Sequence, residues 1–97
     1  MPKAYWVSSY QAIHDETKLA AYAQIAGPAV TAAGGKFIAR GKATKAYEAG
    51  KVERTTLVEF ESMEAAIAAH ETPEYKRALA ALDGGVTRDL RIVAGTE

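Results

Sequence analysis

The stretch that decides the fold is RTTLVEFE, which runs from Arg54 to Glu61. It is rich in β-branched and aromatic residues, and its side chains alternate between two faces. Val58 and Phe60 project to one side, while Leu57 projects to the other. This stretch therefore predicts a strand near the centre of a sheet.

Two helices and a last strand are predicted after this stretch. Ser62 is a good N-cap for a helix over 63–70, whose alanines favour that structure. Thr72 caps a second helix, which has a proline at its first position and ends at Gly84-Gly85. Residues 86–93 then form a strand.

A strand rich in aromatic residues opens the chain before a long helix. Its large side chains would divide between two faces, with Tyr5, Val7 and Ile13 on one and Trp6 and Tyr10 on the other. In a sheet with one solvent-exposed face, apolar and polar side chains would alternate more regularly along each strand. We therefore expect both faces of this strand to be covered.

The helix that follows begins at Asp15 as N-cap and ends at Gly34-Gly35. Pro28 removes a backbone donor inside it, so we expect a kink or a division there. The remaining elements are a strand over 36–40, a weaker hairpin strand over 43–49 and a turn at 50–51.

This order of elements predicts an α+β fold in one domain, residues 1–97. It is the ferredoxin-like split βαβ pattern with an extra β-hairpin strand, in which helices cover one face of an antiparallel sheet. The uncovered face would expose Trp6 and Tyr10, and an apolar patch of that size marks a partner or ligand. We expect a homodimer that packs sheet against sheet.

Composition excludes several classes of function. The 97 residues are 48% hydrophobic and 25% charged, as in ordinary globular proteins. Twelve basic and 12 acidic residues give no net charge to attract nucleic acid. The chain has no cysteine, which excludes disulfides, thiolate nucleophiles and cysteine-based metal sites. No segment reaches the roughly 20 apolar residues that a membrane span requires. A cytoplasmic protein with neither nucleic acid nor membrane as partner is expected.

Arg54 and Glu59 are the candidate catalytic residues, because a charge in a central strand needs a partner. Five positions apart, they lie on opposite faces and cannot form one acid–base pair. Glu59 would face a cavity in the dimer, and Arg54 would grip a carboxylate. The alternative, that each makes a cross-strand or interface ion pair, is favoured two to one.

Candidate ligand-binding residues are Trp6, Tyr10, Tyr22 and Arg40. The three aromatic rings could line a pocket for a flat substrate, although aromatic residues at such spacings more often form core or interface. Arg40 is either a ligand anchor or part of a salt bridge at a strand end.

No metal site or cofactor is predicted. His14 and His70 have no further ligands at metal-binding spacing, so structural or solvated roles are favoured. They are also the only nitrogen ligands that a heme could find.

Several motifs together resemble a bacterial family catalogued as domain of unknown function 1330. They are Tyr5-Trp6, the helix ending Gly34-Gly35-Lys36-Phe37, Arg40-Gly41, Val58-Glu59-Phe60 within 54–62, Thr72-Pro73-Glu74-Tyr75 and Ile92-Val93-Ala94-Gly95. Two positions depart from the family pattern. Leu82 stands where the family tends to have arginine, and Ala94 where it has glutamate.

The family is similar to the dimeric α+β barrel group, which includes cofactor-independent monooxygenases, heme-handling proteins, isomerases and lyases. The resemblance implies the fold and a dimer but no reaction. Two kinds of function remain level: a metal-independent enzyme acting on a small apolar or aromatic metabolite, and a protein that binds such a molecule without turnover. A purely structural dimer is the third hypothesis.

Overall fold

The computed structural model describes residues 2–96, which form four strands and three helices. In chain order these are β1 (Ala4–Ile13), α1 (Glu16–Ala32), β2 (Lys36–Lys42), β3 (Arg54–Phe60), α2 (Met63–His70), α3 (Pro73–Leu82) and β4 (Val86–Ala94). The strands form one antiparallel sheet in the order β2-β3-β1-β4. The predicted ferredoxin-like α+β fold is confirmed.

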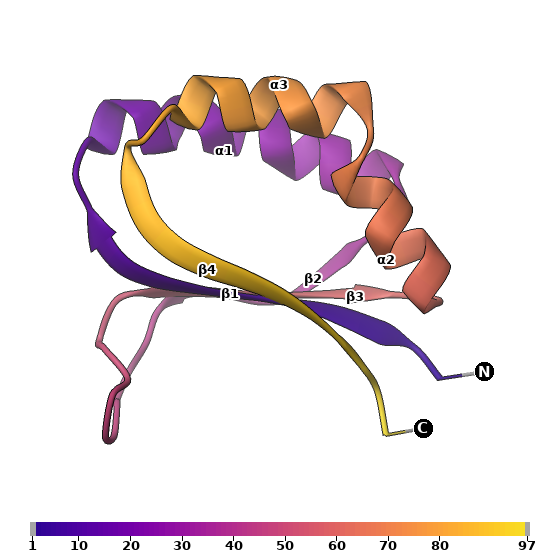
Figure 1. Ribbon diagram of the computed structural model, residues 1–97, viewed down its shortest axis with the longest axis horizontal. Helices are drawn as coiled ribbons and strands as arrows, with labels where there is room; N and C mark the ends of the chain where they lie inside the picture. The colour runs from indigo at the N-terminus through magenta and orange to yellow at the C-terminus, as the bar shows by residue number, and fades with distance from the viewer. Residues whose placement is uncertain (1, 97) are drawn as a thin grey trace.

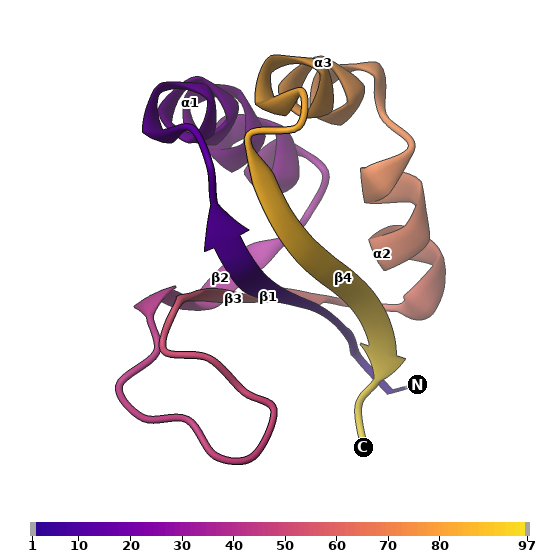
Figure 2. The same cartoon turned by 60° about the vertical axis from the view of Figure 1, so that its left-hand side comes forward.

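The helices lie on one side of the sheet. In Figure 1, α1 and α3 run side by side above the strands, and Figure 2 shows α2 beside the sheet, close to β4. Within residues 2–96, no helix lies over the other face. Two layers therefore enclose the core, and one sheet face stays open.

Local sequence explains where the helices begin. The Asp15 carboxylate accepts hydrogen bonds from the first turn of α1, and the Ser62 hydroxyl does so for α2. Thr72 accepts from the Tyr75 N–H, with a proline at the first turn of α3. Each cap satisfies a backbone donor that has no partner within the helix. All three predicted caps are confirmed.

The structure decides two expectations about secondary structure. Of the kink or division expected at Pro28, the division does not occur, because α1 continues to Ala32, and the kink stays a prediction. The extra hairpin strand over 43–49 is absent from the described residues, whose sheet has four strands. The segment between β2 and β3 is a long loop, seen below the sheet in Figure 1. Its alanine, lysine and glycine residues have low β propensity, which favours a loop.

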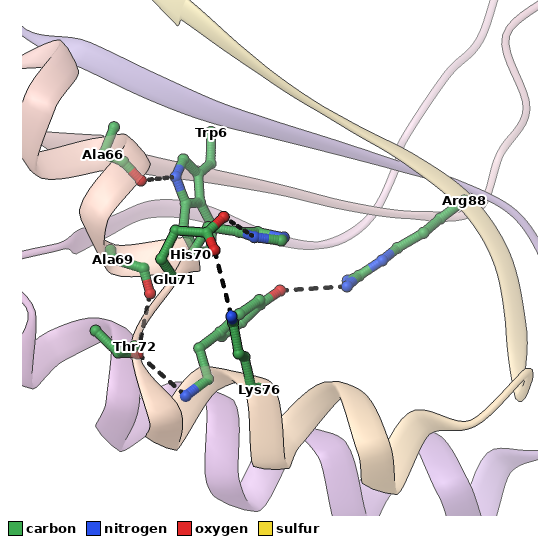
Figure 3. Close-up of polar contacts among 9 residues, drawn as sticks. Trp6, Ala66, Ala69, His70, Glu71, Thr72, Lys76 and Arg88 are labelled. Carbon is green, nitrogen blue, oxygen red and sulfur yellow. Dashed lines mark hydrogen bonds and ion pairs between the residues drawn. The ribbon is translucent and has the colours of Figure 1, made fainter.

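The aromatic side chains Trp6 and Tyr10 lie under the helices, each only 3% exposed. The expectation that they would face outward on the open side is therefore wrong. The Trp6 indole packs against Phe60 and Tyr75, and its Nε1–H donates to the Ala66 carbonyl of α2 at 2.9 Å (Figure 3). These contacts make Trp6 part of the subunit's own core.

The open face carries the alternate side chains of the same strands. Val7 pairs with Leu57 on one side and Arg91 on the other, and Tyr5 pairs with Val93. The Val93 side chain is 51% exposed. This face is thus a mixture of apolar and charged groups.

No helix within residues 2–96 is long and apolar enough to span a bilayer.

Candidate functional site

A cavity lies between the sheet and helix α1, within one subunit. Its walls are Trp6, Ser8, Tyr10, Tyr22, Ala23, Ala26, Gly27, Val30, Phe37, Arg40, Arg54, Thr56, Val58, Arg88 and Leu90. Centres of water-sized molecules have about 40 Å³ in which to move. One water needs about 10–15 Å³ on this measure, so the cavity holds a few water-sized groups.

The sheet register orders the sheet side of the cavity from apolar to cationic. The first row across the strands is Ile92, Trp6, Val58 and Phe37, and the second is Leu90, Ser8, Thr56 and Arg40. In the third, Arg88 pairs with Tyr10. Arg54 precedes the Thr55–Ser9 pair and so lies at the same end. A molecule in this cavity would meet hydrocarbon at one end and guanidinium groups at the other.

Arg88 is the centre of a cluster of phenol groups. Its Nη1 donates to the hydroxyl oxygens of Tyr10 at 2.9 Å and Tyr22 at 3.2 Å, and its Nη2 donates to that of Tyr75 at 3.2 Å. The Tyr22 and Tyr75 hydroxyls also share a hydrogen bond of 2.7 Å. Figure 3 shows Arg88 extending from β4 toward α3. The cluster ties β4, β1, α1 and α3 together around one positive charge.

This cluster is positively charged at neutral pH. Burial, with the adjacent Tyr75 hydroxyl, raises the pKa of Tyr22 well above its usual range, so its phenol stays protonated. Burial by itself would lower the pKa of Arg88, but its interactions with Tyr22 and Tyr75 outweigh that effect, and its pKa is raised. Tyr22 and Arg88 therefore both keep their protons at neutral pH, and Arg88 supplies a positive charge to the cluster.

Two further guanidinium groups reach the cavity. Arg40 is exposed and stacks over the Phe37 ring at 4.3 Å, and Arg54 lies 5.9 Å from the centre of the Tyr10 ring. None of the ion pairs formed within residues 2–96 includes Arg40, Arg54 or Arg88. Three cations thus line one cavity without a carboxylate.

Two buried polar atoms in the walls lack hydrogen-bond partners. Within the described part of the chain, these are the Ser8 hydroxyl oxygen and the Arg54 Nε. Ser8 is only 5% exposed. A buried donor without a partner costs about 1–3 kcal/mol, so such atoms are rare in native proteins and call for an explanation.

The acidic and imidazole side chains lie elsewhere. Glu59 is on the open face, where it accepts from the Tyr5 hydroxyl at 3.3 Å and lies 3.6 Å from the Lys3 ammonium. His14 hydrogen-bonds Thr87 at 2.8 Å, and His70 packs beside Trp6 with ring centres 5.7 Å apart. None of these groups lines the cavity, so the walls that residues 2–96 form contain no carboxylate or imidazole.

Of the residues singled out from the sequence, five line this cavity: Trp6, Tyr10, Tyr22, Arg40 and Arg54. Glu59 lies on the opposite face of β3 from Arg54, so the two candidate catalytic residues are not part of one site. The cavity is also formed by one subunit's sheet and helix, and not between two sheets.

Sequence reasoning missed Arg88 and Ser8. A signal for Arg88 was present, because it alternates with Val86, Leu90 and Ile92 along β4 and so occupies a core-facing position. An arginine in such a row is rarely buried without a partner. Ser8 stands between Trp6 and Tyr10 on the buried face of β1 in the same way.

No group of three or more possible metal ligands occurs within residues 2–96.

The model of a domain of unknown function, DUF1330, matches residues 3–96. The chain belongs to the DUF1330 family. The resemblance noted from its motifs is thereby confirmed. Among curated proteins, none is significantly similar to this chain in sequence.

Several solved structures have a fold similar to that of this DUF1330 chain. A protein of unknown function from Rhodopseudomonas palustris has a TM-score of 0.77 at 16% identity, over 99% of this chain and 84% of that one. SnoaB, a cofactor-independent oxygenase from Streptomyces nogalater, has a TM-score of 0.68 at 11% identity, over 100% and 96%. A dimeric ferredoxin-like protein of unknown function from Thermobifida fusca scores 0.65 at 15% identity, over 96% and 91%. At such identities the likeness concerns the fold alone.

Proposed function

We propose that this protein binds a small, flat, partly apolar molecule in the cavity between its sheet and α1. The observation that carries the proposal is a cavity with aromatic and aliphatic walls that ends at the half-buried Arg88 and the phenol groups around it. Mostly apolar walls with a few convergent polar groups are typical of small-molecule sites.

Room for such a molecule comes from the helix side. Of the five α1 residues in the walls, Ala23, Ala26 and Gly27 have small side chains or none, and a Cβ added at Gly27 would meet nothing within 4 Å. On the sheet side, Arg40 is exposed and can move into solvent. Movement of this rim enlarges the present 40 Å³ when a ligand larger than a few waters enters.

Trp6 provides a direct test, because it is the only tryptophan and lines the cavity. Benzoate, benzamide, phenol and indole derivatives would be added to the protein while Trp6 fluorescence is followed. Only compounds that do not themselves emit in the tryptophan range are used. Binding should change the emission in the wild type and in Gly27→Ala. Gly27→Leu should abolish the change, because its side chain occupies the open space. A panel that leaves Trp6 emission unaffected, or equal binding by Gly27→Leu, would contradict the proposal.

Turnover of the bound molecule is a second candidate function. Its support is the placement of Arg88 and the phenol hydroxyls, which would stabilise negative charge developing on a substrate. The likeness to a cofactor-independent oxygenase agrees with this candidate. The walls formed by residues 2–96 include no carboxylate or imidazole that could serve as a base, so the substrate itself should be acidic. Oxygen uptake with acidic phenols would be measured well below the melting temperature of each variant. Uptake that is lost in folded Arg88→Met and kept in Arg77→Gln would favour turnover over binding alone.

We further propose that two copies pair through the open sheet face. This face carries Tyr5, Val7 and Leu57, with the Asp89–Arg91 ion pair at 3.7 Å beside them. A sheet face with several apolar side chains gains about 25 cal/mol for each Å² of apolar surface covered. The structural neighbour from T. fusca is described as dimeric.

Sedimentation equilibrium tests the pairing. Val93→Asp places a charge on the open face at a side chain already 51% exposed, so the subunit should fold and the dimer should weaken. Ile67→Asp, at a side chain 49% exposed on α2, is the matched control and should remain dimeric. A monomeric wild type at micromolar concentration would exclude this interface.

A further inference from the structure

The cationic end of the cavity selects the chemical class of the ligand. We propose that the bound molecule is a monocarboxylate with an apolar body, whose carboxylate is held by Arg54 and Ser8 while its body lies against Trp6, Val58 and Phe37. This inference rests on the proposed binding function and adds the group that the ligand must carry.

Three arginine side chains give the cavity a local positive charge. Arg40, Arg54 and Arg88 line the same cavity, and no ion pair among the described residues neutralises any of them. The whole chain has 12 acidic residues against 12 basic ones, so the positive charge here is a local arrangement and not a general excess. Arg54 and Arg88 are half-buried, and cations in such positions without a counter-ion favour an anion as ligand.

Two unsatisfied polar atoms lie in the walls of the cavity. The Ser8 hydroxyl and Arg54 Nε are buried in the walls of this same cavity, and neither has a partner in the described structure. Ser8 pairs with Thr56 across β1 and β3, and Arg54 is two residues along β3 on the same face. Side chains so related are diagonal neighbours, about 7–8 Å apart at the backbone, and can reach one small group between them.

A planar carboxylate has the shape that the Arg54 guanidinium binds best. A guanidinium edge donates two parallel N–H groups, which match the two oxygens of a planar carboxylate. The Ser8 hydroxyl can supply a further donor to one of those oxygens. Beyond this end the rows become apolar through Leu90 to Trp6 and Phe37, so the remainder of the ligand must be hydrocarbon or aromatic.

Matched pairs of acid and amide provide the test. Butanoate and benzoate would be compared with butanamide and benzamide at low ionic strength, with Trp6 emission as the signal. Each acid should bind about tenfold or more tightly than its amide, because a charge-assisted contact is lost in the amide. Added salt should reduce this preference.

Variants assign the preference to its residues. Arg54→Gln should remove most of the preference for acids while amides still bind, and Ser8→Ala should weaken acid binding several-fold. Arg77→Gln, an exposed arginine on α3, should behave as wild type. Amides that bind as tightly as acids, or an unchanged preference in Arg54→Gln, would overturn the inference but leave the binding function. Failure of both acids and amides to bind would contradict both.

A measurement without ligand tests the unsatisfied donor separately. Arg54→Met keeps most of the side-chain stem and removes a buried N–H that lacks a partner. The melting temperature of the ligand-free protein should rise by about 4–8 °C. A fall would show that Arg54 serves the fold rather than a ligand, and would overturn its proposed role.

Discussion

Replacement of Arg88 by methionine should destabilise the protein more than any other substitution of an arginine. The Arg88 guanidinium donates to the hydroxyls of Tyr10, Tyr22 and Tyr75, which belong to three different elements. Methionine retains much of the stem and its contacts. The change therefore isolates the charged head from the packing of the chain around it.

The magnitude follows from the partners left behind. Tyr22 and Tyr75 keep their mutual hydrogen bond of 2.7 Å, whereas Tyr10 loses its only described hydroxyl partner, at 2.9 Å. Hydrogen bonds from charged groups contribute about 1.5–3 kcal/mol each, and relief from burying the guanidinium offsets part of the loss. We expect a net loss of about 2–4 kcal/mol in unfolding free energy. For a chain of this size, that lowers the melting temperature by about 10–30 °C.

Urea and thermal denaturation followed by circular dichroism would measure this loss. All variants must be compared at one protein concentration, because subunit association adds to apparent stability. Arg77→Met, at an exposed position of α3, is the control and should change stability by less than about 0.5 kcal/mol. If Arg88→Met also stays within about 0.5 kcal/mol of wild type, the phenol cluster contributes nothing to the fold.

Three further predictions concern packing and pH. Gly35→Ala should lower the unfolding free energy by about 1–3 kcal/mol, because the new Cβ would lie 2.6 Å from Val30 Cγ1 and 2.8 Å from Phe60 Cζ. Urea denaturation that shows wild-type stability would contradict this. Gly27 lies inside α1, and a Cβ added there would meet nothing within 4 Å. Gly27→Ala should therefore raise the unfolding free energy by about 0.5–1 kcal/mol, and a lower urea midpoint than in the wild type would refute this. The raised pKa of Tyr22 means that the folded state holds its proton more tightly than the unfolded state. Stability should therefore be fully present below about pH 10 and fall as pH rises further, and Tyr22→Phe should reduce that alkaline loss.

The positions of the elements could be read from short-range signals. Asp15, Ser62 and Thr72 each cap a helix through a hydroxyl or carboxylate that bonds a backbone N–H within three residues. Gly34 and Gly84 have positive φ angles where the long helix and α3 end. Such signals act between near neighbours in the chain, so local chemistry is sufficient to predict them.

The loop over 43–53 shows where local signals were too weak. Thr44 and Tyr47 suggested a strand, but a strand requires a partner, and β3 pairs with β2 and β1 instead. The Tyr47 side chain is 74% exposed. Strand propensity depends on the neighbouring surface, which short stretches of sequence do not specify.

Alternation along the first strand determined that Trp6 and Tyr10 share a face, because successive side chains in a strand point to opposite sides. It could not determine whether the helices or solvent would cover that face, since Tyr5 and Val7 make the other face apolar as well. The crossover connections decided this, because their handedness places α1 and α3 on one side of the sheet. The candidate site arose in the same way: Arg88 and Tyr22 are 66 positions apart, and only strand register and helix packing bring them to 3.2 Å.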